Sequence, residues 1–174
     1  MSVYAWCLMT NHAHLLLEPS DHSGLGQLMK RLAGRQTRYR NSKEGRTGTL
    51  WESRYKSSLV DEQAYLLACV RYIELNPVCA RMVAMPEEYV WSSYRARIGQ
   101  DSCSWLDPIP GLESIKRDGQ SMAESYAQYV RFAIPDGEWD LIRTAAARNQ
   151  LTGNEKFIEQ MGIMGSPISP PRLG

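Results

Sequence analysis

Two histidines near the amino terminus have the spacing of a metal-binding pair. His12 and His14 flank Ala13 in residues 12–18, an expected strand in which His12, His14 and Leu16 share one face. Residues two apart on a β-strand project from the same face, so both imidazoles can reach one metal ion. The alternative is a polar pair on an exposed strand face. This spacing also begins some metal-dependent hydrolase barrels, but such barrels need about 250 residues and the chain has 174.

A tyrosine and an asparagine form a second pair with chemical potential. Tyr72 and Asn76 lie four residues apart, which places both side chains on one face of a helix. A tyrosine hydroxyl can act as a covalent nucleophile, and an amide oxygen suits a hard cation such as Mg²⁺ or Mn²⁺. The alternative is that Tyr72 packs in the core and Asn76 caps the helix before Pro77.

Positive charge is concentrated in one segment, although the formal net charge of the chain is only +1. Residues 30–56 contain nine lysines and arginines and two glutamates, so the segment carries +7. Tyr39, Trp51 and Tyr55 are interleaved with these charges. Basic side chains contact phosphates and aromatic rings stack on unpaired bases, so the segment predicts nucleic-acid binding. The alternative is a solvated basic helix with aromatic residues that belong to the core.

Hydrophobic periodicity predicts an α+β protein in which strands carry the histidines and a helix carries Tyr72. The expected strands are 3–9, 12–18 and one centred on 55–60, and the expected helices are 25–40, 62–76, 121–132, 139–148 and 154–161. Asp61 is a suitable N-cap for the helix of Tyr72, and we expect Pro77 to stop or kink that helix. In the loop 86–94, Trp91 and Tyr94 are the expected packing anchors.

Composition excludes several classes of protein. No apolar run approaches the roughly 18 residues of a membrane span, and the amino terminus lacks the basic and apolar regions of a secretory signal. The cysteines form no C-x-x-C pair, which argues against a cysteine zinc site and predicts reduced thiols in the cytoplasm; they are Cys7, Cys69, Cys79 and Cys103. Glu18 and Glu74 are expected to be solvated.

Several separate motifs resemble one family of transposases. The signature strand pair of the HUH nucleases, in which two histidines flank a hydrophobic residue, is similar to YAWCLMTNHAHLLLEP at residues 4–19. The order and spacing of motifs in the REP-associated tyrosine transposases resemble those of LWESRYKSSLVD, YLLACVRYIELNPVCARMV and PEEYVWSSYRA, which begin at residues 50, 65 and 86. The resemblance covers most of residues 3–110.

The resemblance implies a site, a mechanism and a fold. It assigns the nucleophile to Tyr72 and the ligands of a Mg²⁺ or Mn²⁺ ion to His12, His14 and Asn76. The implied reaction cleaves and rejoins single-stranded, hairpin-containing DNA through a 5′-phosphotyrosine, on a ferredoxin-like antiparallel sheet with packed helices. The residues that we then expect to hold the DNA are Lys30, Arg31, Arg35, Arg38, Arg54, Tyr55 and Lys56. A homodimer or a monomer is expected, in the cytoplasm and at the nucleoid when DNA is bound.

One departure from the family concerns the amino terminus. Family members usually carry a further strand and helix before the histidine strand pair, so we expect an incomplete sheet with an exposed edge. The expected organisation is a catalytic domain at 1–100, a helical extension at 101–164 and a disordered tail at 165–174. Two other functions stay open at this point: a non-catalytic nucleic-acid-binding module or decayed transposase, and a phosphodiesterase that uses water in place of tyrosine.

Overall fold

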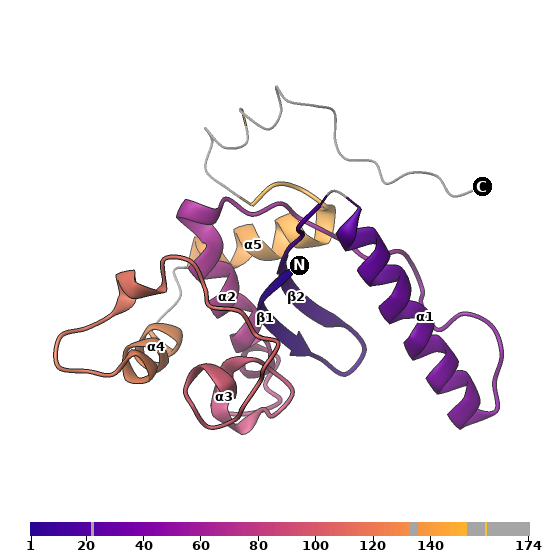
Figure 1. The fold of residues 1–174 in the computed structure, drawn as a ribbon, viewed down its shortest axis with the longest axis horizontal. Helices are drawn as coiled ribbons and strands as arrows, with labels where there is room; N and C mark the ends of the chain where they lie inside the picture. The colour runs from indigo at the N-terminus through magenta and orange to yellow at the C-terminus, as the bar shows by residue number, and fades with distance from the viewer. Residues whose placement is uncertain (22, 133–135, 153–158, 160–174) are drawn as a thin grey trace.

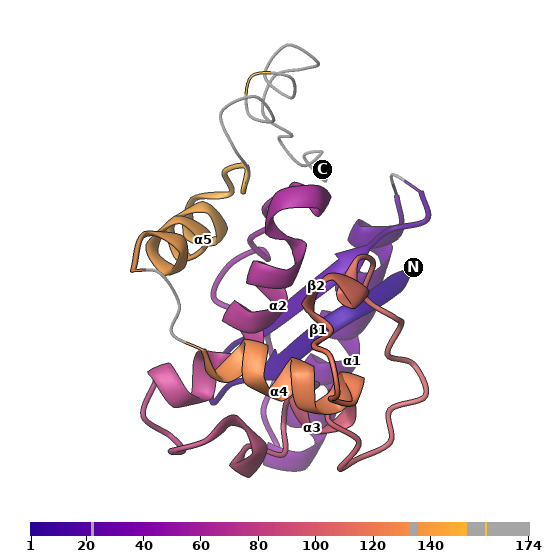
Figure 2. The same cartoon turned by 90° about the vertical axis from the view of Figure 1, so that its left-hand side faces the viewer.

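A central helix packs on a two-stranded antiparallel sheet in this protein (Figures 1 and 2). The structure is a computed structural model, and it describes residues 1–21, 23–132, 136–152 and 159. The elements within these residues are β1 (Ser2–Leu8), β2 (Ala13–Glu18), α1 (Gly24–Glu44), α2 (Glu62–Cys79), the 3-10 helix η1 (Pro86–Glu88), α3 (Tyr94–Arg97), the 3-10 helix η2 (Leu112–Ile115), α4 (Met122–Arg131) and α5 (Asp136–Arg148). The predicted α+β class is confirmed.

The strand pair that carries the histidines forms as predicted, with ends that differ by one residue. Strand β1 pairs with β2 so that Cys7 lies opposite His14, and the backbone N–H of Met9 closes the turn by donating to the carbonyl oxygen of His12 at 2.8 Å. The outer edge of β1 is covered by the chain after η1, where Ser93 N–H donates to the carbonyl of Trp6. The sheet therefore holds His14 in a fixed register.

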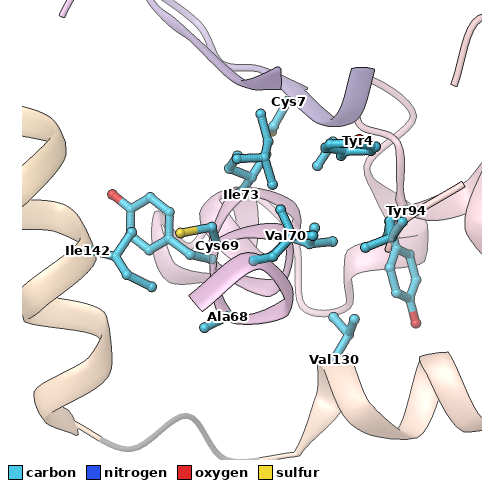
Figure 3. Packing of buried hydrophobic residues seen from close by; sticks show 14 of the residues in the cluster. Tyr4, Cys7, Ala68, Cys69, Val70, Ile73, Tyr94, Val130 and Ile142 are labelled. Carbon is cyan, nitrogen blue, oxygen red and sulfur yellow. The ribbon is translucent and has the colours of Figure 1, made fainter. Parts of the chain in front are cut away.

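Helix α2 lies at the centre of the hydrophobic core (Figure 3). Seen along the helix, Ile73 points toward Cys7 of β1, and Cys69 points toward Ile142 of α5. Val70 lies on the side of α4 and is fully buried. The sheet, α2 and the two carboxy-terminal helices thus share one core, and the domain boundary near residue 100 stays a prediction. Among the described residues, no helix combines the length and the apolar character that a membrane crossing requires.

The predicted helices that lie within the described residues form, but three of their ends differ from expectation by more than one residue. Helix α5 begins three residues before the predicted residue 139. Helix α1 continues four residues beyond 40 and ends at Gly45, whose left-handed backbone (φ 61°) lets its N–H donate to the carbonyl of Asn41. Pro77 does not stop α2, which continues to Cys79. Proline lacks a backbone donor and removes one helical hydrogen bond, and this loss falls only two residues before the helix ends. Helix α4 begins at the predicted place, capped by Ser121.

Three other expectations were wrong. Residues 55–60 do not form a strand of the sheet: within the described residues Val60 makes only an isolated bridge to Thr152, because this segment pairs with the chain after α5. The side chain of Trp91 is 60% exposed, and this residue contacts β1 through its backbone, where its carbonyl oxygen accepts from the N–H of Leu8. Tyr94 is buried as predicted. Glu74 is fully buried. The predicted helix 154–161, apart from residue 159, and the tail 165–174 lie outside the described residues.

Candidate active site

The two histidines point their ring nitrogens at each other. His12 Nε2 lies 3.2 Å from His14 Nε2, and the two rings are nearly perpendicular with centroids 4.9 Å apart. His12 is exposed and its Nδ1 lies 2.7 Å from Asn11 Oδ1, a contact that fixes the ring orientation and leaves Nε2 facing His14. The strand geometry predicted from the sequence thus brings both Nε2 atoms to one point.

His14 stays neutral over most of the pH range. Burial, with a smaller contribution from the charge of His12, lowers the pKa of His14 from 6.5 to about 4. A neutral imidazole is the form that binds a metal ion. His14 is therefore ready to act as a ligand near neutral pH.

Tyr72 meets this histidine pair from α2. Its ring packs edge-on against His14, with ring centroids 5.7 Å apart and planes at 85°, because α2 lies against both strands. The side chain is 7% exposed. Burial raises the pKa of the Tyr72 phenol, while the charge of Arg143 and a hydrogen bond with Asn76 act in the opposite direction. The phenol is consequently protonated at neutral pH unless a cation stabilises its anion.

Asn76 lies one helical turn after Tyr72 and is half-buried. Its amide nitrogen donates to the carbonyl oxygen of Tyr72 at 2.8 Å. This bond fixes the side chain while engaging only the nitrogen, and the atom that suits Mg²⁺ or Mn²⁺ is the amide oxygen. The observed hydrogen bond of Asn76 is therefore compatible with the expected role of its amide oxygen as a metal ligand.

The histidine pair fits a divalent metal ion. Two ligand nitrogens that lie about 2.1 Å from one ion, at roughly a right angle, are about 3 Å apart, which agrees with the 3.2 Å between His12 and His14. Within the described part of the chain, no group of three or more His, Cys, Asp or Glu side chains could hold a metal ion. Further ligands would therefore be oxygen atoms of Asn76, water or a phosphate, which leaves room for a substrate.

Helix α5 completes the surroundings of Tyr72. Trp139 also packs on Tyr72, with ring centroids 4.5 Å apart. Directly before these two residues, Arg71 of α2 forms an ion pair with Glu138 of α5. Two consecutive contacts thus fix the position of α5 relative to the nucleophile.

Sequence reasoning missed the contributions of Asn11, Trp139 and Arg143. Asn11 is adjacent to His12, so its role could have been suspected. Trp139 and Arg143 lie four apart in a predicted helix and share a face. Nothing in their spacing relates that face to Tyr72, because the contact between α5 and α2 joins residues that are far apart in the chain.

The predicted DNA-binding residues lie on a different part of the protein. Helix α1, which carries Lys30, Arg31, Arg35 and Arg38, has no buried residue and extends to one side of the sheet (Figure 1). Arg54, Tyr55 and Lys56 are exposed in an irregular segment that is not a strand. Trp51 connects this segment to α1, because its indole N–H donates to the carbonyl of Ala33 at 3.1 Å. Four of the seven residues therefore lie on α1 and three on the segment after it.

Comparisons with known proteins agree with this arrangement. The family described as "Transposase IS200 like" matches residues 1–76, a segment that includes both histidines, the basic segment, Tyr72 and Asn76. No curated protein and no solved structure matches the chain. The match supports a transposase, a class of enzyme that processes DNA. Residues 1–76 of the chain are thus similar to the IS200-like transposases.

Proposed function

We propose that this transposase cleaves and rejoins single-stranded, hairpin-containing DNA, with Tyr72 as the nucleophile. The observation that carries the proposal is the direct contact between Tyr72 and His14, whose ring centroids are 5.7 Å apart. His12 and His14, with Asn76, would hold a Mg²⁺ or Mn²⁺ ion. We place the reaction in the cytoplasm, at the nucleoid when DNA is bound.

The residues of the chain have defined roles in this reaction. The Tyr72 oxygen attacks the scissile phosphorus and loses its proton, the bond from phosphorus to the 3′-oxygen breaks, and the 3′-oxygen takes up a proton. The products are a 5′-phosphotyrosine and a free 3′-hydroxyl. In the second step a 3′-hydroxyl attacks the phosphotyrosine and restores the tyrosine, so no external energy source is needed. A bound divalent ion would supply Lewis-acid stabilisation of phosphate charge.

The packing of Tyr72 determines how DNA approaches. Its ring packs against both His14 and Trp139, which fixes the side chain before substrate binds and reduces the entropy lost in reaching the attack geometry. We place the phosphate at the histidine pair, because His12 is exposed there. The basic segment on and after α1 would hold the flanking DNA through its phosphates.

Covalent trapping tests the proposal. The protein is mixed with end-labelled single-stranded hairpin DNA and Mn²⁺, and a denaturing gel separates protein–DNA adducts. We expect an adduct that requires metal and is absent from Tyr72→Phe, which lacks only the hydroxyl. Tyr65→Phe is the matched control, because Tyr65 lies on the same helix and packs against the same core. An adduct that survives in Tyr72→Phe would exclude Tyr72 as the nucleophile.

The burial of Tyr72 and its raised pKa favour a second candidate, a non-catalytic nucleic-acid-binding module. Such a module would bind DNA with a strong salt dependence and would form no adduct at any metal concentration. Cleavage without an adduct, unchanged in Tyr72→Phe, would instead indicate a phosphodiesterase that uses water. The trapping gel distinguishes these three outcomes.

A further inference from the structure

A groove of about 650 Å³ opens next to the candidate active site. Its walls come from the end of α2, the chain before and at η1, the end of α4 and the start of α5. A pocket of roughly 300–1,000 Å³ is typical of a small-ligand site. The volume of the groove therefore suits one compact group as the occupant.

The groove and the nucleophile share a wall. Trp139 lines the groove, and its ring packs on the ring of Tyr72 with centroids 4.5 Å apart. Leu75, one turn beyond Tyr72 on α2, lines the same groove. A group bound here would therefore lie beside the residue that we propose attacks the DNA.

The lining of the groove is aromatic and apolar with charged groups among it. Phe132 is 69% exposed, the largest exposed fraction among the large hydrophobic side chains of the described residues, and Met85 is 38% exposed. Both side chains therefore present apolar surface to the groove. Arg131 and Asp140 also line the groove, and Arg131 forms an ion pair with Glu87 of η1 that connects the end of α4 to the opposite wall.

We propose that this groove receives an unpaired nucleobase of the DNA strand whose phosphate is presented to Tyr72; the inference rests on the proposed function. A nucleobase has flat apolar faces that stack on aromatic rings and polar edges that hydrogen-bond. Phe132 and Trp139 supply the aromatic surfaces. Arg131 and Asp140 supply a donor and an acceptor for the edge of the base. Because α4 and α5 form two of the walls, the carboxy-terminal helices would select the base at the cleavage position.

Binding measured without cleavage tests this inference. The background is full-length Tyr72→Phe without added metal, so that no strand is cut. Fluorescence anisotropy gives the affinity for a mixed-sequence single-stranded oligonucleotide and for an abasic oligonucleotide of equal length. Removing a ring that stacks on a base costs about 1–3 kcal/mol, so Phe132→Ala is expected to weaken binding of the base-bearing strand about tenfold and to leave the abasic strand unchanged.

A control variant and a crosslink complete the experiment. Trp91→Ala removes an aromatic side chain of similar exposure, 60%, that does not line the groove, and it is expected to change neither affinity. An oligonucleotide with 5-iodouracil should crosslink to peptides that contain Phe132 or Trp139. Equal losses with both strands, no loss in Phe132→Ala, or crosslinks only elsewhere would overturn the inference.

Two outcomes separate this inference from the proposed function. If Tyr72 forms an adduct but Phe132→Ala binds both strands normally, the base site is wrong and the tyrosine mechanism stands. If the protein binds neither strand, both proposals fail. A change in sedimentation from dimer to monomer in Phe132→Ala, with DNA affinity intact, would show that a second copy occupies the groove and would overturn the base site.

Discussion

The chemistry of the candidate site depends on three side chains that come from two elements and a turn. His12 Nε2 and His14 Nε2 lie 3.2 Å apart, and Tyr72 packs against His14. Type and spacing alone marked each of these residues as a candidate, because strand and helix periodicities are local properties of the chain, and the family resemblance assigned their roles. Their mutual contact could not be predicted from spacing, because it depends on how α2 lies across the sheet.

A substitution in the histidine pair should separate metal binding from DNA binding. In His14→Ala one of the two converging imidazoles is lost, so Mn²⁺ affinity is expected to fall by at least about tenfold and the covalent adduct to disappear. DNA affinity at fixed salt is expected to stay within about twofold, since the basic segment is elsewhere. Electron paramagnetic resonance of Mn²⁺ measures the first quantity and anisotropy the second. Unchanged Mn²⁺ affinity would place the ion at another position.

Arg143 should affect how readily Tyr72 ionises. Its positive charge opposes the rise in the pKa of Tyr72 that burial causes, so Arg143→Gln is expected to raise that pKa further. The rate of adduct formation would then fall several-fold at pH 7.5, and its rise with pH would move to higher pH. Initial rates between pH 7 and 9.5 check this result. The control is Arg148→Gln, in the last turn of the same helix, and equal profiles for the two variants would contradict the prediction.

The elements show where local sequence signals are sufficient and where they are not. Composition predicted β1 and alternation of side chains predicted β2, and the predicted start of α4 coincides with a capping box at Ser121 in the structure. Residues 55–60 have strand-like composition but pair with the chain after α5, where Thr152 N–H donates to the carbonyl of Leu59. A strand requires a partner edge, and composition does not show which edge is available.

Helix α1 should be the least protected of the long helices. It has no buried residue, whereas α2 supplies more residues of the buried core cluster than any other described element. Helices without tertiary packing open readily, so amides of α1 are expected to exchange with deuterium much faster than those of α2. Binding of single-stranded DNA to Lys30, Arg31, Arg35 and Arg38 should slow exchange in α1 selectively. Hydrogen exchange followed by mass spectrometry measures both effects, and no change in α1 with bound DNA would exclude it as the DNA-binding element.

At the scale of the whole molecule, one buried carboxyl connects the sheet side of the protein to its carboxy-terminal helices. Glu74 of α2 accepts hydrogen bonds of 2.6 Å from Ser93 Oγ and from the Tyr126 hydroxyl of α4. Burial raises its pKa from 4.5 to about 7, although these hydrogen bonds and the charge of Arg97 act against the shift. Sequence alone suggested a solvated glutamate, because its burial results from α3 and α4 closing over α2.

The Glu74 carboxyl should affect how the free energy of unfolding depends on pH. The folded protein keeps the Glu74 proton up to about pH 7, whereas the unfolded chain releases it near 4.5. Its contribution to the free energy of unfolding is therefore complete below pH 4.5 and is lost as the pH rises through 7. His14 has the opposite sign, because its pKa falls from 6.5 to about 4 on folding, so its contribution increases as the pH rises through that range. In the wild type the opposite pH dependences that Glu74 and His14 give to the free energy of unfolding partly cancel.

Glu74→Gln should remove the pH dependence of stability that Glu74 causes and leave the one that His14 causes. Glutamine keeps an acceptor oxygen and adds an amide donor for Ser93 or Tyr126, and it carries no charge that burial could disfavour. We expect its free energy of unfolding to rise more steeply than that of the wild type between pH 4.5 and 6.5. At pH 8 the variant should be the more stable protein, by up to about 3 kcal/mol. Urea unfolding followed by circular dichroism from pH 4.5 to 8 gives both curves, with the exposed Glu113→Gln as control. Parallel curves for Glu74→Gln and the wild type would show that Glu74 is ionised in the folded protein, and the contact between α2 and α4 would then depend on a buried anion stabilised by Arg97.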